Sequence, residues 1–311
     1  MRPAFIRVFA VTALGLALAG CATSPADISR WAALGGYDAV ARIRPELSSP
    51  LPATREAAIA ALLKMPDDPA AVGALTTATL SPDPSVRAEV GAALLLNANE
   101  DLDFYSITLV ADLDPSVRRK IAQGLAAVGR AGPLLNTQRA GVYLWGLTQD
   151  GNADVRAAAV EGVGGLGLND PIDFALKALR DDPEPRVRAA AARGLGGPAR
   201  AYLVSAMNGK SSDAILPSPA RGEEIVAALC QAARADQGKY SEVRSDRVLF
   251  WTERVEETHW VATAAADALT VPGVPPRADL AEALGAAHAL GSPAPLPAHL
   301  RTNPSHHPGP L

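Results

Sequence analysis

Residues 83–94 read Asp-Pro-Ser-Val-Arg-Ala-Glu-Val-Gly-Ala-Ala-Leu, and this stretch decides the fold because it returns along the chain. Close copies begin at Asp114, Asn152 and Glu184. The valines of the four copies are 31, 38 and 32 residues apart, at Val86, Val117, Val155 and Val187. Weaker copies are found at Thr54-Arg55, Pro219-Ala220-Arg221 and Val261-Ala262. A period of this length indicates an array of structural repeats.

Each copy has the features of one amphipathic helix, which we call a Val-Arg helix. Asp or Asn is a favourable N-cap, and Pro suits the first helical position. The valine and the apolar residues four and eight positions later form one stripe. Intervening helices are predicted at Tyr37–Leu47, Ala70–Leu80, Asp103–Leu113, Ala140–Leu147, Ile172–Leu179 and Ala201–Met207. One helix pair cannot bury its own apolar face, so we expect an all-α fold, an α-solenoid of about six to seven stacked antiparallel helix pairs.

The pattern Asp-Pro-x-Val-Arg-x-x-Ala-x-x-x-Leu resembles the HEAT-like repeats first noted in phycobilin lyases, over about residues 36–270. The resemblance implies that Asp and Arg side chains bridge successive repeats. The arginines concerned would form a structural ladder of Arg87, Arg118, Arg156 and Arg188. A row of arginines that binds a polyanion is the alternative. Phycobilin attachment is not implied, because the repeat is widespread in proteins without that chemistry.

The N-terminus has the features of a secretion signal. Two arginines precede an apolar stretch from Val8 to Ala19, which is too short to span a bilayer as a helix. The stretch ends in Leu18-Ala19-Gly20-Cys21, which resembles the lipobox of bacterial lipoproteins. The resemblance implies cleavage before Cys21 and lipidation of that residue. Since alanine and not aspartate follows, it also implies anchoring in the outer membrane, facing the periplasm. An ordinary signal peptide with a coincidental cysteine is the alternative.

The sequence predicts five regions: a lipoprotein signal peptide at 1–20, a lipidated N-terminus and tether at 21–35, the repeat array at 36–271, a C-terminal capping helix at 272–290, and a Pro-rich disordered tail at 291–311. The step of 38 residues predicts a Gly/Pro-containing excursion near residues 129–139. Residues 239–260 interrupt the repeat and contain Phe250 and Trp251, which we expect to cap the core or, alternatively, to bind a partner.

Charge and motifs exclude several functions. The chain has 29 basic and 33 acidic residues, so we expect no nucleic-acid partner. It has no G-x-S-x-G, H-E-x-x-H or P-loop motif. We therefore expect no metal site and no cofactor. Cys230 lies in an apolar helical stretch, where a free cysteine is typically a small buried residue.

In repeat arrays of this family the Val-Arg helices usually line the concave side. Positions three and six residues after the repeat valine then line this concave face, and Arg119 lies beside them. Together with the aromatic pair at 250–251, the candidate partner-binding residues are Glu89, Arg119, Lys120, Gln123, Glu161 and Arg193. Small residues that alternate with both charge signs suit a protein or peptide groove. A plain solvated face is the alternative.

Two classes of function remain. The first is a membrane-anchored, non-enzymatic interaction scaffold or adaptor of the bacterial cell envelope, which binds another envelope protein or peptide. The second is an enzyme or enzyme subunit, lyase-like or accessory to an envelope enzyme. Its chemistry would lie in residues 239–260, where His259 and Glu256 or Glu257 would converge with Cys230.

Replacing the predicted lipidation site tests the N-terminal assignment. A Cys21→Ala variant should remain uncleaved or be released from membranes, because no thiol is left to receive the lipid. Membrane fractionation with an immunoblot for the precursor measures both effects. A variant that is processed and that fractionates as the wild type does would show that the lipoprotein assignment is wrong.

Overall fold

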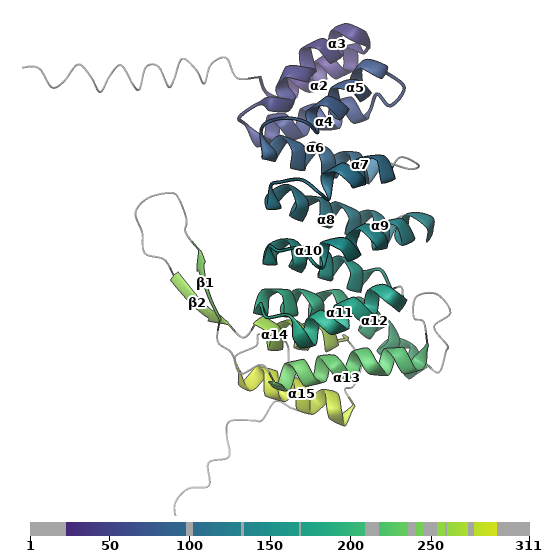
Figure 1. Ribbon diagram of the computed structural model, residues 1–311, viewed down its shortest axis with the longest axis vertical. Helices are drawn as coiled ribbons and strands as arrows, with labels where there is room; N and C mark the ends of the chain where they lie inside the picture. Colours follow the sequence, from purple (N-terminus) through teal and green to yellow (C-terminus); the bar gives the residue numbers. More distant parts are fainter. Residues whose placement is uncertain are drawn as a thin grey trace, which may run out of the picture. The chain divides into compact units, whose positions relative to one another are not determined.

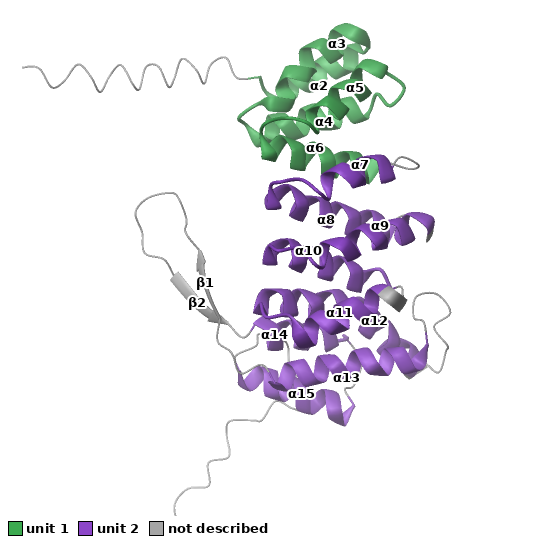
Figure 2. Ribbon diagram, in the orientation of Figure 1, with its two compact units in different colours: residues 1–97 green, residues 98–311 purple. Residues whose placement is uncertain are grey.

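The computed structural model describes residues 23–97, 102–131, 134–167, 169–208, 218–235, 240–244, 254–258, 260–272 and 277–290 (Figure 1). The chain forms two compact units, residues 1–97 and residues 98–311 (Figure 2). The described elements are helices that pack in pairs, except for one short hairpin of strands. This architecture confirms the prediction of an all-α solenoid.

Unit 1 is built around helix α4. Its elements are α2 (Pro25–Leu34), α3 (Gly36–Ile43), the 3₁₀ helix η1 (Arg44–Ser48), α4 (Pro52–Leu63), α5 (Pro69–Ala78) and α6 (Pro84–Asn97). Helix α4 packs against α2, α5 and α6. Large apolar side chains from four of these helices are fully buried, among them Ile28, Ile43, Leu62 and Leu95. The weak repeat copy at Thr54-Arg55 therefore lies in a true core helix.

Helix α2 corrects the prediction of a tether over residues 21–35. Ser24 and Asp27 form a reciprocal capping box that starts the helix at Pro25. Ile28 is fully buried, and α2 packs on α4. The hydroxyl of Thr54 also donates to the carbonyl oxygen of Thr23 at 3.1 Å. Residues 25–34 are thus part of the fold, since the cap starts the helix and Ile28 is buried where α2 packs on α4.

Unit 2 is a stack of two helical layers. Its helices are α7 (Leu102–Leu109), α8 (Pro115–Ala131), α9 (Leu134–Leu147), α10 (Ala153–Gly165), α11 (Asn169–Asp181), α12 (Pro185–Asn208), α13 (Pro219–Ala235), α14 (Trp260–Leu269) and α15 (Ala278–Ala289). The Val-Arg helices α8, α10 and α12 pack on one another in order, and α14 continues their layer. The intervening helices α7, α9 and α11 form the second layer, which α13 continues (Figure 1).

The stripe of each Val-Arg helix forms the core of unit 2. The repeat valines Val117, Val155 and Val187 are fully buried. The apolar residues four and eight positions after each valine are also 0% exposed, namely Ile121, Ala159, Ala191, Leu125, Val163 and Leu195. Burial of this stripe in every repeat supplies the hydrophobic driving force for stacking.

Glycine allows α10 and α12 to pack backbone against backbone. A Cβ atom added to Gly194 would lie 2.6 Å from the carbonyl oxygen of Glu161. A Cβ atom added to Gly164 would lie 2.9 Å from the backbone of Gly194. Real Cβ atoms do not approach a backbone so closely, so both positions require glycine. The Gly-rich end of α10 is therefore a packing surface, as its position at the end of a repeat helix indicates.

Three parts of unit 2 differ from the sequence predictions. Residues 201–207 do not form a separate helix, because α12 continues through Pro198 to Asn208 while it packs against α10 and α14. Helix α13, which begins at the weak copy at 219–221, lies in the intervening layer and not in the Val-Arg layer. Strands β1 (Tyr240–Arg244) and β2 (Arg254–Thr258) form an antiparallel hairpin within the irregular segment.

The excursion predicted near residues 129–139 is also largely helical. Helix α8 runs on to Ala131, and α9 begins at Leu134. The hydroxyl of Thr137 donates to the carbonyl oxygen of Gly129 at 2.8 Å and so joins the two helix ends. The additional residues of the 38-residue step therefore lengthen two helices. At the C-terminal end, α15 lies within the segment predicted as a capping helix.

A charge introduced at a repeat valine tests the core of unit 2. Val117→Asp should lower the free energy of unfolding by several kcal/mol, because it buries an unpaired carboxylate. Thermal unfolding followed by circular dichroism measures the change. The matched control is Ser116→Asp, which places the same charge on the neighbouring exposed residue in the first turn of α8. Equal melting curves for both variants would contradict the assignment of Val117 to the core.

Candidate functional site

Two repeat arginines of unit 2, Arg118 and Arg156, join successive repeats by paired hydrogen bonds. Arg118 donates from Nε and Nη2 to the two carboxylate oxygens of Asp150 at 2.6 and 2.9 Å. Arg156 donates in the same way to Asp182 at 3.0 and 3.2 Å. The third nitrogen of each guanidinium, Nη1, donates to the backbone carbonyl six residues earlier, at 2.7 Å from Arg118 to Asp112. Each arginine thus fixes its own loop and the loop of the next repeat.

Asp150 of this ladder is held in its ionised form. Asp150 also accepts a hydrogen bond from the backbone N–H of Asn152 at 2.8 Å. The hydrogen bonds from Arg118 are the largest cause that lowers the pKa of the Asp150 carboxyl below its usual range. Both side chains of this pair are largely shielded from solvent. The pair therefore acts as a structural clamp between repeats.

The other ladder arginines contact their own loops. Arg87 donates to the carbonyl oxygen of Ser81 at 2.7 Å, and Arg188 to that of Asp182 at 2.8 Å. In unit 1 the equivalent of the clamp is formed by Arg55, which donates to both carboxylate oxygens of Glu89 at 2.8 and 2.6 Å. Glu89, predicted as a partner-binding residue, is therefore half-buried in an ion pair within its own unit.

The predicted concave-face residues of unit 2 share one exposed stripe on the Val-Arg helices. Arg119, Lys120 and Gln123 are exposed on α8. Arg193 on α12 pairs with Glu161 on α10 at 2.9 Å. The pairing of Arg186 with Asp154, also at 2.9 Å, repeats this arrangement nearer the start of the two helices. The charges of α10 and α12 on this stripe thus neutralise each other.

The intervening helices expose a different surface, which is apolar. Two positions of the repeat form this surface, 13 and ten residues before the repeat valine. They are equivalent positions in the three successive helices α7, α9 and α11. The first position holds Phe104, Val142 and Phe174, and the second holds Ile107, Trp145 and Lys177. We call the five apolar members, Phe104, Ile107, Val142, Trp145 and Phe174, the apolar face. Its members on α7 and α9 are 49–64% exposed, although apolar side chains gathered on one surface are unusual in a soluble protein.

Unit 1 shows that the repeat does not require this surface. The equivalent positions before Val86 are Gly73 and Thr76 on α5. The intervening helix of unit 1 therefore folds and packs without large apolar residues there. The apolar face is a property of the repeats in unit 2 and not of the repeat as such.

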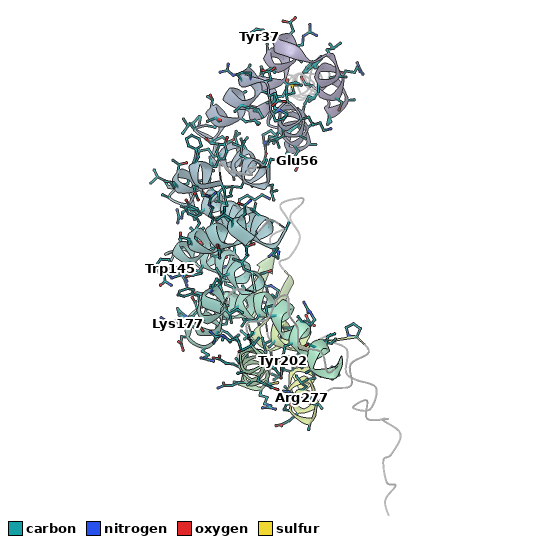
Figure 3. The ribbon with its side chains drawn as sticks, turned by 90° about the vertical axis from the view of Figure 1, so that its right-hand side faces the viewer. Tyr37, Glu56, Trp145, Lys177, Tyr202 and Arg277 are labelled. Atoms are coloured by element: carbon teal, nitrogen blue, oxygen red, sulfur yellow. The ribbon has the colours of Figure 1, made fainter. Side chains whose placement is uncertain are left out.

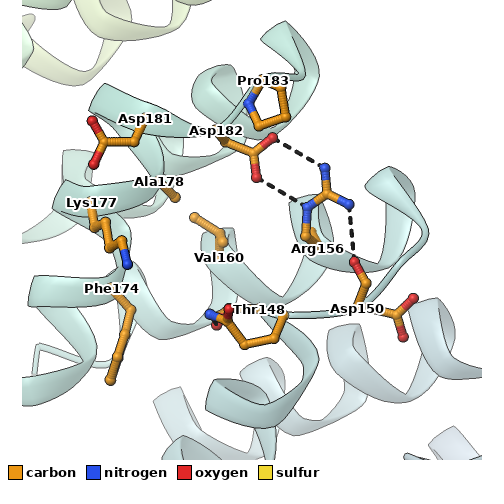
Figure 4. Close-up of a pocket in the computed structure, with 11 residues that line it drawn as sticks. Thr148, Asp150, Arg156, Val160, Phe174, Lys177, Ala178, Asp181, Asp182 and Pro183 are labelled. Carbon is orange, nitrogen blue, oxygen red and sulfur yellow. Dashed lines mark hydrogen bonds and ion pairs between the residues drawn. The ribbon is translucent and has the colours of Figure 1, made fainter.

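A cavity of about 390 Å³ lies at the α11 end of the apolar face (Figure 4). Its lining residues are Thr148, Gln149, Asp150, Arg156, Val160, Phe174, Lys177, Ala178, Asp181, Asp182 and Pro183. The ring centroids of Phe174 and Trp145 are 5.9 Å apart. Since Phe174 lines the cavity, the cavity continues the apolar face. The Arg156–Asp182 pair forms the opposite wall (Figure 4).

Lys177 carries the charge that distinguishes this cavity. The ammonium group of Lys177 is turned toward the cavity, whereas the carboxylate of Asp181 is turned away from it (Figure 4). The carboxylates of Asp150 and Asp182 are both occupied by arginine. Trp145 and Lys177 also lie on the same side of unit 2 (Figure 3).

The sequence contains a signal for the apolar face that the valine repeat does not reveal. In α9 the buried stripe consists of Ala140, Leu144 and Leu147. Val142 and Trp145 lie between these positions and therefore on the opposite side of the helix. An intervening helix needs apolar residues on only one face for its contact with the core. Apolar residues on a second face therefore indicate a contact surface for another molecule.

Several candidate residues contribute no described geometry. Cys21, Phe250, Trp251 and His259 lie outside the described residues.

Cys230 is buried on α13, and burial raises the pKa of its thiol to about 11, which disfavours a nucleophilic thiolate. Within the described ranges, His, Cys, Asp and Glu side chains form no group of three that could hold a metal ion. None of the described helices combines the length and the apolar character of a membrane span.

A family model matches part of the repeat array. Residues 106–196 match a family model described as HEAT repeats. The complex of CpcE and CpcF of phycocyanin lyase from Nostoc is similar at 24% identity, over 50% of this chain and 98% of that chain, with a TM-score of 0.42. Two engineered proteins are similar at 18% identity. The match to the first covers 61% of this chain and 97% of the engineered chain, with a TM-score of 0.36. The match to the second covers 88% of this chain and 70% of the engineered chain, with a TM-score of 0.38. No curated protein matches the chain. The family match confirms the HEAT-like repeats predicted for this part of the sequence.

Removing one clamp should change both stability and its pH dependence. Arg118→Gln should lower the free energy of unfolding at pH 7 by about 1–3 kcal/mol, because Asp150 loses its charged donor. The unfolded pKa of an aspartate is about 3.9, and that of folded Asp150 is lower. Its stabilising contribution is therefore complete above the unfolded pKa and is lost as the pH falls through the folded pKa.

Unfolding followed by circular dichroism from pH 7 to pH 3 checks this prediction. The wild type should lose more stability on acidification than Arg118→Gln does. The control is Arg193→Gln, which breaks a half-exposed ion pair and should cost less than about 1 kcal/mol. Equal losses for the two variants would contradict the structural role of the clamp.

Proposed function

We propose that this protein is a lipid-anchored, non-enzymatic scaffold of the bacterial cell envelope that binds another protein through the apolar face of unit 2. The lipobox-like sequence at 18–21 supports the anchor and the envelope location. The exposure of Phe104, Ile107, Val142 and Trp145 at matched positions of α7 and α9 is the observation that carries the binding function.

The apolar face has the composition of an interface core. Aromatic residues are enriched at the buried centre of protein interfaces, and Trp is among the residues that most often dominate binding energy. Covering the exposed side chains of α7 and α9 would remove a large apolar area from water. The packing of α7 and α9 leaves these side chains in water. A partner that covers them is therefore stabilised by the burial of their apolar surface.

The stripe on the Val-Arg helices remains a second candidate surface for a partner. Among its described residues, Arg119 and Lys120 on α8 are cations without a carboxylate partner, whereas Glu161 and Arg193 satisfy each other. Such charges act mainly on the rate of encounter and on its salt dependence. We therefore assign the binding energy to the apolar face and leave a steering role to α8.

Site-specific photocrosslinking in cells that express the full chain separates the two surfaces. A benzoylphenylalanine at position 142 should capture a discrete envelope protein, because the side chain at this position lies in the apolar face. The matched position is 123, an exposed site on the Val-Arg helix α8. A product at 142 that Trp145→Ala removes from a still-folded protein supports the proposal.

Capture at position 123 alone would move the interface to the Val-Arg helices and contradict the assignment. Absence of any product at both positions, with the protein correctly localised, would contradict the scaffold function itself.

A further inference from the structure

We propose that the cavity beside Phe174 binds an acidic residue of the partner together with its neighbouring apolar side chain, so that Lys177 selects a segment of apolar–acidic sequence. This inference rests on the proposed function, since it identifies the chemistry of the segment that the apolar face receives. The observation that carries it is the position of Lys177: the apolar face ends in a cavity, and the ammonium group beside that cavity forms no ion pair with a carboxylate of the described residues.

The order of side chains along the three intervening helices gives the surface a direction. The position ten residues before the repeat valine is isoleucine on α7, tryptophan on α9 and lysine on α11. Axes of packed helices are about 8–10 Å apart, so these side chains follow one another at about that spacing. A segment that crosses the three helices therefore meets two apolar side chains and then a cation.

The cavity accepts a side chain beside that cation. Val160, Phe174, Ala178 and Pro183 provide apolar lining, and Thr148 and Gln149 provide polar groups. A volume of about 390 Å³ lies within the range of small ligand pockets and exceeds what one water molecule fills. The lining thus suits an apolar side chain that has a polar group at one edge.

Charge complementarity identifies the polar group as a carboxylate. The guanidinium of Arg156 in the cavity wall is occupied by Asp182 and by backbone carbonyls. Lys177 is exposed, and its ammonium is turned toward the cavity (Figure 4). The carboxylates of Asp150 and Asp182 in the wall are neutralised by arginine. The third lining carboxylate, that of Asp181, is turned away from the cavity (Figure 4). A carboxylate of the partner can therefore approach the Lys177 ammonium from within the cavity.

Selection from a random peptide library displayed on phage tests the inference with the full chain as bait. The peptides are fused through their C-termini, so that any carboxylate selected belongs to a side chain. The wild type should enrich peptides in which Asp or Glu adjoins a large apolar residue. Lys177→Glu should lose this acidic preference, while the exposed lysine control Lys120→Glu should keep it.

A labelled synthetic copy of an enriched peptide then provides the affinity. By fluorescence anisotropy, Lys177→Glu should weaken binding roughly tenfold, since it replaces an attraction by a repulsion at a partly exposed site. Trp145→Ala should also weaken binding, and Lys120→Glu should leave it unchanged. Circular dichroism verifies that each variant is folded.

Enrichment of acidic peptides that Lys177→Glu leaves unaltered, or no enriched peptide family at all, would overturn the inference. If the crosslink at position 142 still forms in that case, the scaffold function stands and only the partner chemistry is wrong. If the crosslink is also absent, the proposed function fails first.

Discussion

Burial of the repeat valine stripe is the constraint on which unit 2 depends. Because each Val-Arg helix must present its valine and the residues four and eight positions later to its neighbours, the helices stack in one fixed register. Glycines in α10 and α12 then allow direct backbone contact between Gly164 and Gly194. Because packing fixes this register, side chains at equivalent positions of successive repeats lie next to each other.

Two surfaces with different roles result from this register. On the loop side, Arg118 and Arg156 meet the aspartates of the following repeats and clamp the stack. On the intervening helices, the same period aligns Phe104 with Val142 and Ile107 with Trp145. The first alignment satisfies charges within the protein, whereas the second leaves apolar area exposed. Only the second therefore leaves free energy for a partner to gain.

Much of the fold could be predicted from the sequence, because the repeat signal is local and periodic. Caps and the valine stripe define most Val-Arg helices. The predicted break before residue 201 was wrong, since packing of α12 against α10 and α14 outweighs the helix-breaking tendency of Gly196, Gly197 and Pro198. The docking of α2 involves the buried side chain of Ile28 and the hydrogen bond from Thr54 to Thr23, which are contacts distant in sequence that no periodic pattern reveals.

The candidate site was harder to predict, because it consists of departures from the core pattern on helices that carry no motif. The cavity also depends on the clamp: Arg156 and Asp182 form one wall, and Asp150 belongs to the preceding clamp. The contact that holds two repeats together therefore also forms one wall of the cavity beside Phe174. A substitution in the clamp would change stability and binding together, whereas Lys177 belongs to the cavity but not to the clamp. Lys177 is thus a lining residue at which the proposed recognition can be tested separately from folding.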